Sequence, residues 1–413
     1  WRLAGDAAFA FAPEQVLAPR EYLVVAARPA LLLAAYPGLS AAKVAGPFDG
    51  ALDNGGGKVA LIDAGGAGID SASYDDDFPW PIEADGYGTA PWRGASLERL
   101  CADAHASLVA NWLASPPDGA TPGAANSLVT CDLPPCVLSL ETSPAAPGAP
   151  IEVTAHLSEP VAATDLRLAY FAKRRHDDLF NPEAVDFTAE DDHYVAALPA
   201  FEADTWVRWR IERLTEDDWV MLAPRAGEPR EQPWFALFVP PPAAPAMPAY
   251  HLFLAPEDWA AIYKNALDGR AIGDTVLDSW DATVPALFAS GDRAFDVRVR
   301  FQGSQWQRAG GYDATAAFGC EGPADFLPAR LLSFRIGFPK YDQFRGRKAL
   351  ILNKQHDWGT ADFRFHGLQT RTGFRLFQAA GVAAPDTRFA RLRINGCDFH
   401  VVLEIERPDE EFL

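Results

Sequence analysis

Short runs of alternating or consecutive apolar residues recur through the first 240 residues of the chain. Two of them lie at 22–25 and 59–62, and clusters of turn-forming residues stand at 53–57 and 65–68. Successive side chains of a β-strand point to opposite faces, and Gly, Asn and Asp supply the tight turns between strands. The pattern predicts a first region of short strands joined by hairpins.

A second strand-rich region begins near Val137, after a stretch rich in Pro, Gly, Ser and Asn at 115–127. Apolar residues alternate cleanly along 151–157 and along 205–211. Trp206 and Trp209 could together suggest a sugar-stacking platform, but their odd spacing places them on opposite faces of the strand. We therefore expect both to pack in cores, within an immunoglobulin-like sandwich over 137–240.

The pattern changes after the proline-rich run 240–245, which predicts a stiff, extended linker. A third, α+β domain is expected over 249–413. Its predicted elements are a helix starting near 256–259, strands at 295–301 and 332–338, a helix at about 362–380 ending at Gly381, and strands at 389–394 and 399–406 joined by Asn395-Gly396. The long helix carries apolar residues at Phe365, Leu368, Leu376 and Phe377, as an amphipathic helix does.

Composition limits the classes of function. The chain has 413 residues, of which 49% are hydrophobic, so most of it should fold into about three domains. Its formal net charge of -20, without a stripe of Lys and Arg, disfavours nucleic-acid binding. An acidic surface can hold divalent cations, but it more often serves solubility. No apolar run reaches the length of about 18 residues that a membrane span needs.

Five cysteines leave several pairings open. Cys131 and Cys136 flank two prolines and can bridge, or Cys101 can pair with one of them, in an oxidising compartment. Unpaired small core residues are an equal alternative. The spacing is not that of a zinc site, and we predict no metal ligands.

Five segments of the first region carry a family resemblance: residues 46–54 (GPFDGALDN), 74–81 (YDDDFPWP), 84–88 (ADGYG), 96–99 (SLER) and 121–123 (TPG). Together they resemble a lamin tail domain over 1–127, without that family's opening strands. The resemblance implies an immunoglobulin-like sandwich with a display or interaction role. The acidic residues 75–77, near Asp85, could hold calcium, although a solvated loop is the favoured interpretation.

The middle region, with residues 191–199 (DDHYVAALP) as its most recognisable piece, is similar in style to immunoglobulin- or fibronectin-like spacers. That resemblance implies spacing between neighbouring domains and nothing more.

The third region contains the segments 284–286 (VPA), 296–304 (DVRVRFQGS), 333–336 (SFRI), 350–353 (LILN), 380–385 (AGVAAP), 394–396 (ING) and 404–409 (EIERPD). From Ala249 to Leu413 the chain resembles the N-terminal part of the CotH kinase family of spore-coat proteins. The resemblance implies an atypical protein kinase that uses ATP and Mg²⁺ and phosphorylates a secreted or coat protein. It implies a secreted or cell-surface bacterial protein, with catalytic residues and metal-holding aspartates beyond Leu413.

The residues that we expect to contact the nucleotide are Arg300, Gly303, Arg335, Asn353 and Glu406. Arg300 and Gly303 lie in a strand and turn that would cover a nucleotide, and glycine permits close backbone approach. Other interpretations stay open: a turn glycine beside a surface arginine, a helix cap at Asn353, and a solvated charge at Glu406. Arg335 is the preferred phosphate contact, with Arg330, Lys340 and Lys348 as other candidates.

Two features argue against activity. Leu331 and Leu332 stand where the family usually carries a Lys-Lys pair, and the helix over 363–380 has no acidic residue. The alternative hypothesis is a non-enzymatic surface display or adhesion protein with a degenerate kinase-like lobe. In either case the predicted fold class is multidomain and mainly β: two immunoglobulin-like β-sandwiches followed by an α+β kinase-like lobe.

Overall fold

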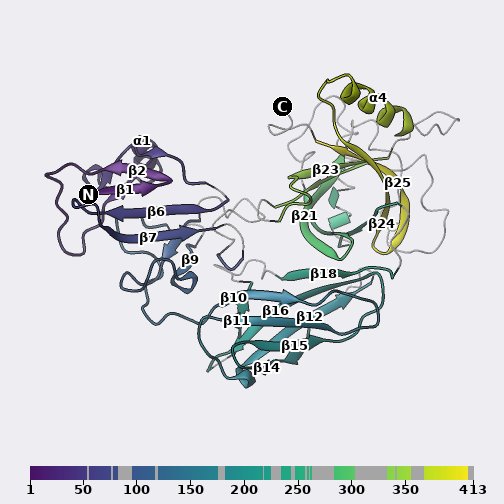
Figure 1. Ribbon diagram of the computed structural model, residues 1–413, viewed down its shortest axis with the longest axis horizontal. Coiled ribbons are helices and arrows are strands. Elements are labelled where there is room, and N and C mark those ends of the chain that lie inside the picture. Colours follow the sequence, from purple (N-terminus) through teal and green to yellow (C-terminus); the bar gives the residue numbers. More distant parts are fainter. Residues whose placement is uncertain are drawn as a thin grey trace.

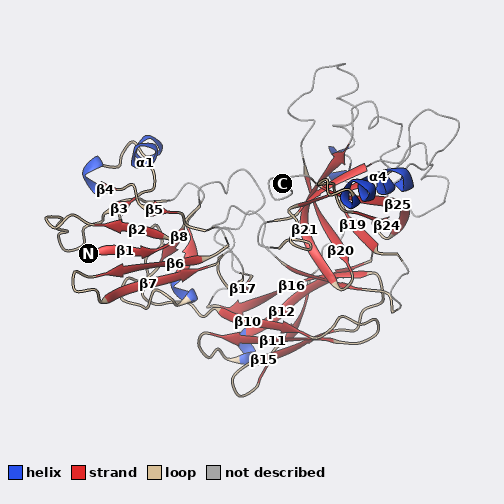
Figure 2. Cartoon of the chain, turned by 45° about the horizontal axis from the view of Figure 1, so that its top comes forward, coloured by secondary structure: helices blue, strands red, loops and turns tan. Residues whose placement is uncertain are grey.

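The computed structural model describes residues 1–53, 55–75, 78–81, 95–116, 120–174, 182–216, 218–224, 234–242, 247–255, 258–259, 261–262, 283–302, 333–339, 342–354 and 367–407. Strands dominate this part of the chain, so the prediction of a mainly β protein is confirmed (Figures 1 and 2). No helix in it is long and apolar enough to span a membrane.

The first unit, residues 1–131, is built on one five-stranded sheet. Its elements are β1 (Arg2–Gly5), β2 (Ala7–Ala10), β3 (Val24–Val25), α1 (Pro29–Ala35), β4 (Val44–Ala45), β5 (Asp49–Gly50), β6 (Gly57–Ile62), β7 (Gly68–Tyr74), β8 (Leu97–Arg99) and β9 (Trp112–Ala114). The sheet has the order β5-β2-β1-β6-β7, while β8 and β9 pair as a separate ribbon. The hairpin predicted at 65–68 is confirmed, and Gly66 takes the positive φ that its turn requires.

The middle unit, residues 137–239, consists of two sheets around one core. Its strands are β10 (Val137–Thr142), β11 (Ile151–Leu157), β12 (Leu166–Lys173), β13 (Glu183–Asp186), β14 (Thr188–Ala189), β15 (Tyr194–Leu198), β16 (Thr205–Leu214), β17 (Trp219–Ala223) and β18 (Phe235–Val239). One sheet has the order β10-β11-β15-β14, and the other contains β13-β12-β16-β18 with β17 paired to β16. Ile151 and Val153 from the first sheet share a buried cluster with Leu168 and Val207 from the second.

The last unit is a sheet that closes on itself. Its elements are β19 (Ala249–Phe253), β20 (Val284–Ser290), β21 (Arg293–Gln302), β22 (Ser333–Gly337), β23 (Ala349–Asn353), α4 (Gly367–Ala379), β24 (Thr387–Ile394) and β25 (Cys397–Glu406). The pairing runs β21-β20-β19-β24-β25-β23-β22, and β22 pairs back to β21. We call these seven strands the ring. Aromatic side chains fill its interior, with Tyr250, Phe288, Phe295 and Phe334 fully buried.

The middle unit and the ring are in direct contact. Strand β18 pairs with β21 at Leu237 and Arg293, so one sheet continues across both units. Trp206 and Trp209 of β16 lie in two different buried clusters, as their spacing predicted, with Trp206 on the side of the ring. The middle unit therefore contacts the ring directly, whereas the resemblance implied only that it spaces neighbouring domains.

Helix α4 lies on the side of the ring away from the middle unit (Figure 1). The helix predicted at about 362–380 is confirmed over the described residues, and Gly381 follows it with a φ of 75°. An amphipathic helix usually turns its apolar residues to a core, yet Leu368, Leu376 and Phe377 are exposed. Side chains of the strands themselves already fill the inner face of the ring. The three apolar side chains of α4 therefore do not cover that face.

Candidate functional site

The first unit has an open cavity of about 610 Å³ between β6, β7 and the β8-β9 ribbon. This volume lies within the range of about 300–1,000 Å³ that is usual for small-molecule sites. Apolar side chains such as Leu61, Val59 and Trp112 make up most of the lining, and Asp53, Asp70 and others contribute polar groups. The cavity is therefore a candidate binding site for a small, largely apolar molecule.

The carboxylates around this cavity already have protein partners. Asp70 accepts hydrogen bonds from Arg99, at 2.6 Å, and from the backbone N–H of Ser71. Asp53 accepts from the backbone N–H of Gly55 at 2.9 Å. In the acidic run where calcium was considered, Asp76, Asp77 and Asp85 lie outside the described residues, so the calcium interpretation stays a prediction.

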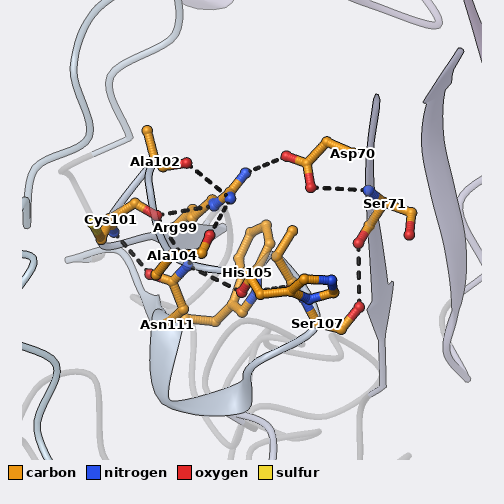
Figure 3. Close-up of polar contacts among 11 residues, drawn as sticks. Asp70, Ser71, Arg99, Cys101, Ala102, Ala104, His105, Ser107 and Asn111 are labelled. Atoms are coloured by element: carbon orange, nitrogen blue, oxygen red, sulfur yellow. Dashed lines mark hydrogen bonds and ion pairs between the residues drawn. The ribbon is translucent and has the colours of Figure 1, made fainter. Parts of the chain in front are cut away.

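Arg99, the last residue of β8, connects the sheet to the loop after that strand (Figure 3). Its guanidinium donates to the backbone carbonyls of Cys101 and Ala102, each at 3.1 Å, and also to that of Ala104. Asn111, fully buried, holds the same loop, because its amide accepts from Cys101 N at 2.8 Å and donates to Cys101 O at 3.0 Å. Arg99 and Asn111 thus shape one wall of the cavity.

A disulfide between Cys101 and Cys131 closes this loop onto the end of the unit. It is one of the pairings that the sequence left open, and Cys136 is a buried cysteine outside this disulfide. Cys101, Asp103 and Cys131 also lie close enough together to be a candidate metal cluster among the described residues. The disulfide uses both sulfur atoms, so this cluster cannot supply thiolate ligands while the bond is formed.

In the ring, three of the predicted nucleotide contacts share one face. Val299, Phe334 and Leu352 point into the filled interior. Because strand residues alternate, their neighbours Arg300, Arg335 and Asn353 lie on the outer face of β21, β22 and β23. Arg300 and Arg335 are register partners on adjacent strands.

Arg300 and Arg335 place two guanidinium groups on neighbouring strands of this face. Guanidinium groups bind phosphate with two parallel hydrogen bonds. Asn353, on the next strand, adds an amide to the same outer face. This outer face can therefore hold a phosphate group.

Sequence reasoning did not single out a further cation at this end of the sheet, Lys354. It is 7% exposed, and its backbone N–H donates to Ser333 Oγ at 3.0 Å. Lysine is rarely fully buried, so the burial of Lys354 directly after the strand residue Asn353 marks it in the structure, but nothing in the sequence does. Gly303, Leu331 and Leu332 lie outside the described residues.

Glu406 lies in a different group of interacting side chains. Register places it opposite Leu350, on the inner face of the ring. Arg347 contacts its carboxylate at 3.3 Å, and the backbone N–H of Asp386 donates to it at 3.0 Å. The structure therefore separates Glu406 from Arg300, Arg335 and Asn353.

Glu404, two residues earlier, is the buried centre of the polar contacts on the inner face. It was not identified from the sequence. It is 2% exposed, it accepts a hydrogen bond from the hydroxyl of Tyr250, and Arg345 lies 3.1 Å away. Burial, with the charge of Glu404, raises the pKa of Tyr250. Tyr250 thus stays protonated and keeps donating, as expected of a structural ion-pair network.

Comparison with known proteins gives one distant similarity. No protein-family model matches the chain. The inner spore coat protein H of Bacillus subtilis (strain 168) is 23% identical to it over 167 residues, which is 40% of this chain and 36% of that protein. The chain therefore contains a CotH-like region, and the match spans about a third of the relative's length.

Proposed function

We propose that the CotH-like region binds ATP and transfers its terminal phosphoryl group to a secreted or coat protein, as an atypical kinase of the CotH type. The observation that carries this proposal is the placement of Arg300 opposite Arg335 on the outer face of the ring. The distant similarity to a spore coat protein supports the coat-related setting.

Phosphoryl transfer depends on positioning and on cations that compensate the charge of the phosphates. Arg300 and Arg335 supply two such cations, and Asn353 adds a hydrogen-bonding amide on the same face. The interior of the ring is filled by aromatic side chains, with Phe288 and Phe334 fully buried. Among the residues that the structure describes, the outer face is therefore the surface left for a nucleotide.

The residues described near Arg335 fit the phosphates better than they fit Mg²⁺. Magnesium prefers carboxylate oxygens and water. On the same face of β21, the carboxylate of Asp296 is already paired with Arg208, and Glu406 points to the inner face. The magnesium requirement and the catalytic carboxylates are expectations from the family resemblance.

The disulfide supports a location outside the cytoplasm. Cys101 and Cys131 form a bond of a kind that persists in oxidising compartments. We therefore infer a secreted or surface-bound protein, with a protein substrate on the cell surface or the coat as its partner.

Thermal unfolding in the presence of ATP and Mg²⁺ tests the proposal. A ligand that binds only the folded protein raises the melting temperature. We expect ATP to raise it for the wild type and not for Arg335→Glu. Arg391→Glu is the matched control, because Arg391 is an exposed arginine of β24 that pairs with Asp398. Lack of an ATP-dependent shift in the wild type would overturn the proposal.

The second candidate is a non-enzymatic display or adhesion protein in which the first two units bind and the kinase-like lobe is degenerate. The cavity of the first unit favours it, as do Leu331 and Leu332 in the sequence. A screen of small apolar molecules, followed through the tryptophan fluorescence of the wild type compared with Trp112→Phe, separates the two candidates. Binding there without any ATP-dependent shift would support the display protein.

A further inference from the structure

The surface between the middle unit and the ring has the composition of a permanent interface. Trp206 and Phe238 from the middle unit form one buried cluster with Phe253 and Leu287 from the ring. Phe238 is 1% exposed and Phe253 3%. The ring centroids of Trp206 and Phe253 lie 5.7 Å apart. Large aromatic residues in a fully desolvated patch typically dominate the energy of an interface.

The strands of the middle unit that meet the ring are covered on both faces. On β16, Val207 and Trp209 point into the core of the middle unit, while Trp206 points to the ring. On β18, Leu237 likewise points into the core of the middle unit, and Phe238 points to the ring. Without the ring, the aromatic side chains of Trp206 and Phe238 would form an exposed apolar patch of a kind that soluble proteins avoid.

Two ion pairs cross the same surface. Arg208 of β16 makes a two-pronged contact with Asp296 of β21, one arm of which is 2.5 Å long. Asp204 contacts Arg393 of β24 at 2.6 Å. These four side chains are 15% to 30% exposed, so both pairs lie at the partly solvated rim. They set the register in which the aromatic cluster meets.

The main chain also crosses the boundary. Leu237 and Arg293 are register partners, and Phe238 N donates to Asp292 O at 3.4 Å. A spacer domain needs none of these contacts. We propose that the outer face of β19, β20, β21 and β24 is a dedicated binding surface for the middle unit of the same chain, so that residues 137–407 act as one body. This inference is independent of ATP binding.

Cleavage of the connection tests the proposal in the full chain. A protease recognition sequence inserted between Pro242 and Met247 allows the purified protein to be cut between β18 and β19. The cut protein is then passed over a size-exclusion column under native conditions. We expect the two fragments to elute together, because the interface and not the connection holds them. Separate elution of the wild-type fragments would overturn the proposal.

Charge variants identify the surface. Arg208→Glu should weaken the association of the cut fragments by about 30-fold or more, because it leaves Asp296 facing a like charge. Adding Asp296→Arg should restore it. Arg298→Glu is the matched control, because Arg298 lies on the same face of β21 and contacts Thr283 within the ring. Equal effects of Arg208→Glu and Arg298→Glu would contradict the assignment.

Calorimetry of the uncut wild type gives a second test that needs no variant. If the middle unit and the ring are one body, they unfold in a single transition. Two separate transitions for residues 137–239 and 249–407 would overturn the proposal even if the fragments stay together.

Discussion

The first unit and the ring are stabilised by different means. In the first unit, the buried apolar residues are mostly alanines such as Ala106 and Ala114, and polar contacts through Arg99 and Asn111 hold the loops. In the ring, aromatic side chains such as Phe295 and Phe334 pack against one another without exposure. One unit relies on directional bonds and a disulfide, the other on close packing.

This difference decides where a ligand can bind. The first unit has an open cavity of about 610 Å³, whereas buried side chains fill the interior of the ring over the described residues. A small molecule can therefore bind in the cavity of the first unit, while on the described part of the ring the surface left for it is the outer face, where Arg300 and Arg335 lie. The display hypothesis depends on the cavity of the first unit, and the kinase hypothesis depends on the outer face of the ring.

The largest expected effect is on packing in the ring. Phe334 is fully buried and lies against Phe301 and Phe399, with ring centroids 5.5 and 5.7 Å away. Phe334→Ala should cost about 4 kcal/mol of unfolding free energy, measured by urea denaturation. Leu61→Ala, at the cavity of the first unit, removes less packing and should cost about 1 kcal/mol. Equal losses of unfolding free energy for the two substitutions would mean that the two units do not differ in how closely they are packed.

The disulfide should matter next, and only for the first unit. Its cysteines are 30 residues apart, and closing a loop of that length stabilises the folded state by roughly 3.5 kcal/mol in the chain-entropy account. Cys101→Ser combined with Cys131→Ser should lower the stability of the first unit by about that amount, as followed by urea unfolding. Cys136→Ser, at a buried cysteine outside the disulfide, is the control, and a loss as large there would contradict the account.

The joint between the middle unit and the ring should be sensitive to acid. Burial, together with the nearby Arg393, lowers the pKa of His251 to about 4, against the opposing influence of Asp204 and Asp398. The unfolded chain, with the ordinary value of 6.5, binds a proton more readily. Stability is therefore fully present above about pH 6.5 and falls towards pH 4, by on the order of 3 kcal/mol.

The variant His251→Phe keeps an aromatic ring against Phe238, whose centroid is 4.4 Å away, and removes the titrating group. Thermal unfolding between pH 4 and pH 7, roughly the range that the shift spans, should then lose part of its pH dependence. His105→Gln, at an exposed histidine of the first unit, should leave the dependence unchanged. An unaltered profile for His251→Phe would refute the assignment.

The smallest expected effect is a gain from filling the cavity. Ala72 lines it on β7, and Ala72→Val adds two methyl groups that suit a strand. The first unit should become more stable by up to about 1 kcal/mol in urea unfolding. Ser73→Val, on the exposed neighbouring position, should bring no such gain. A loss of stability at Ala72 would mean that the cavity walls cannot accommodate added volume.

Local patterns in the sequence predicted the local structure well. The alternating run 151–157 is strand β11, and Asn395-Gly396 forms the turn of the β24-β25 hairpin, with φ of 49° and 80°. The opposite burial of Trp206 and Trp209 followed from their spacing alone. In each case the information lies within a few residues, where period and turn chemistry are decisive.

Contacts between distant segments could not be predicted in this way. The closure of the ring joins β21 to β22, and β19 pairs in parallel with β24 some 140 residues further along, at Tyr250 and Leu392. Strand periodicity gives the face of a residue but not the partner of its strand. For the same reason Glu406 was grouped with Arg335, although register turns it to the inner face and to Arg347.

Hydrogen exchange with and without ATP tests the central claim most directly, because it reports on both kinds of surface in one experiment. The account predicts that ATP slows exchange in peptides that cover β21, β22 and β23, and leaves those of residues 1–131 unchanged. Protection confined to the walls of the cavity near Trp112, or no change anywhere in the chain, would contradict the assignment of the ATP site to the outer face of the ring.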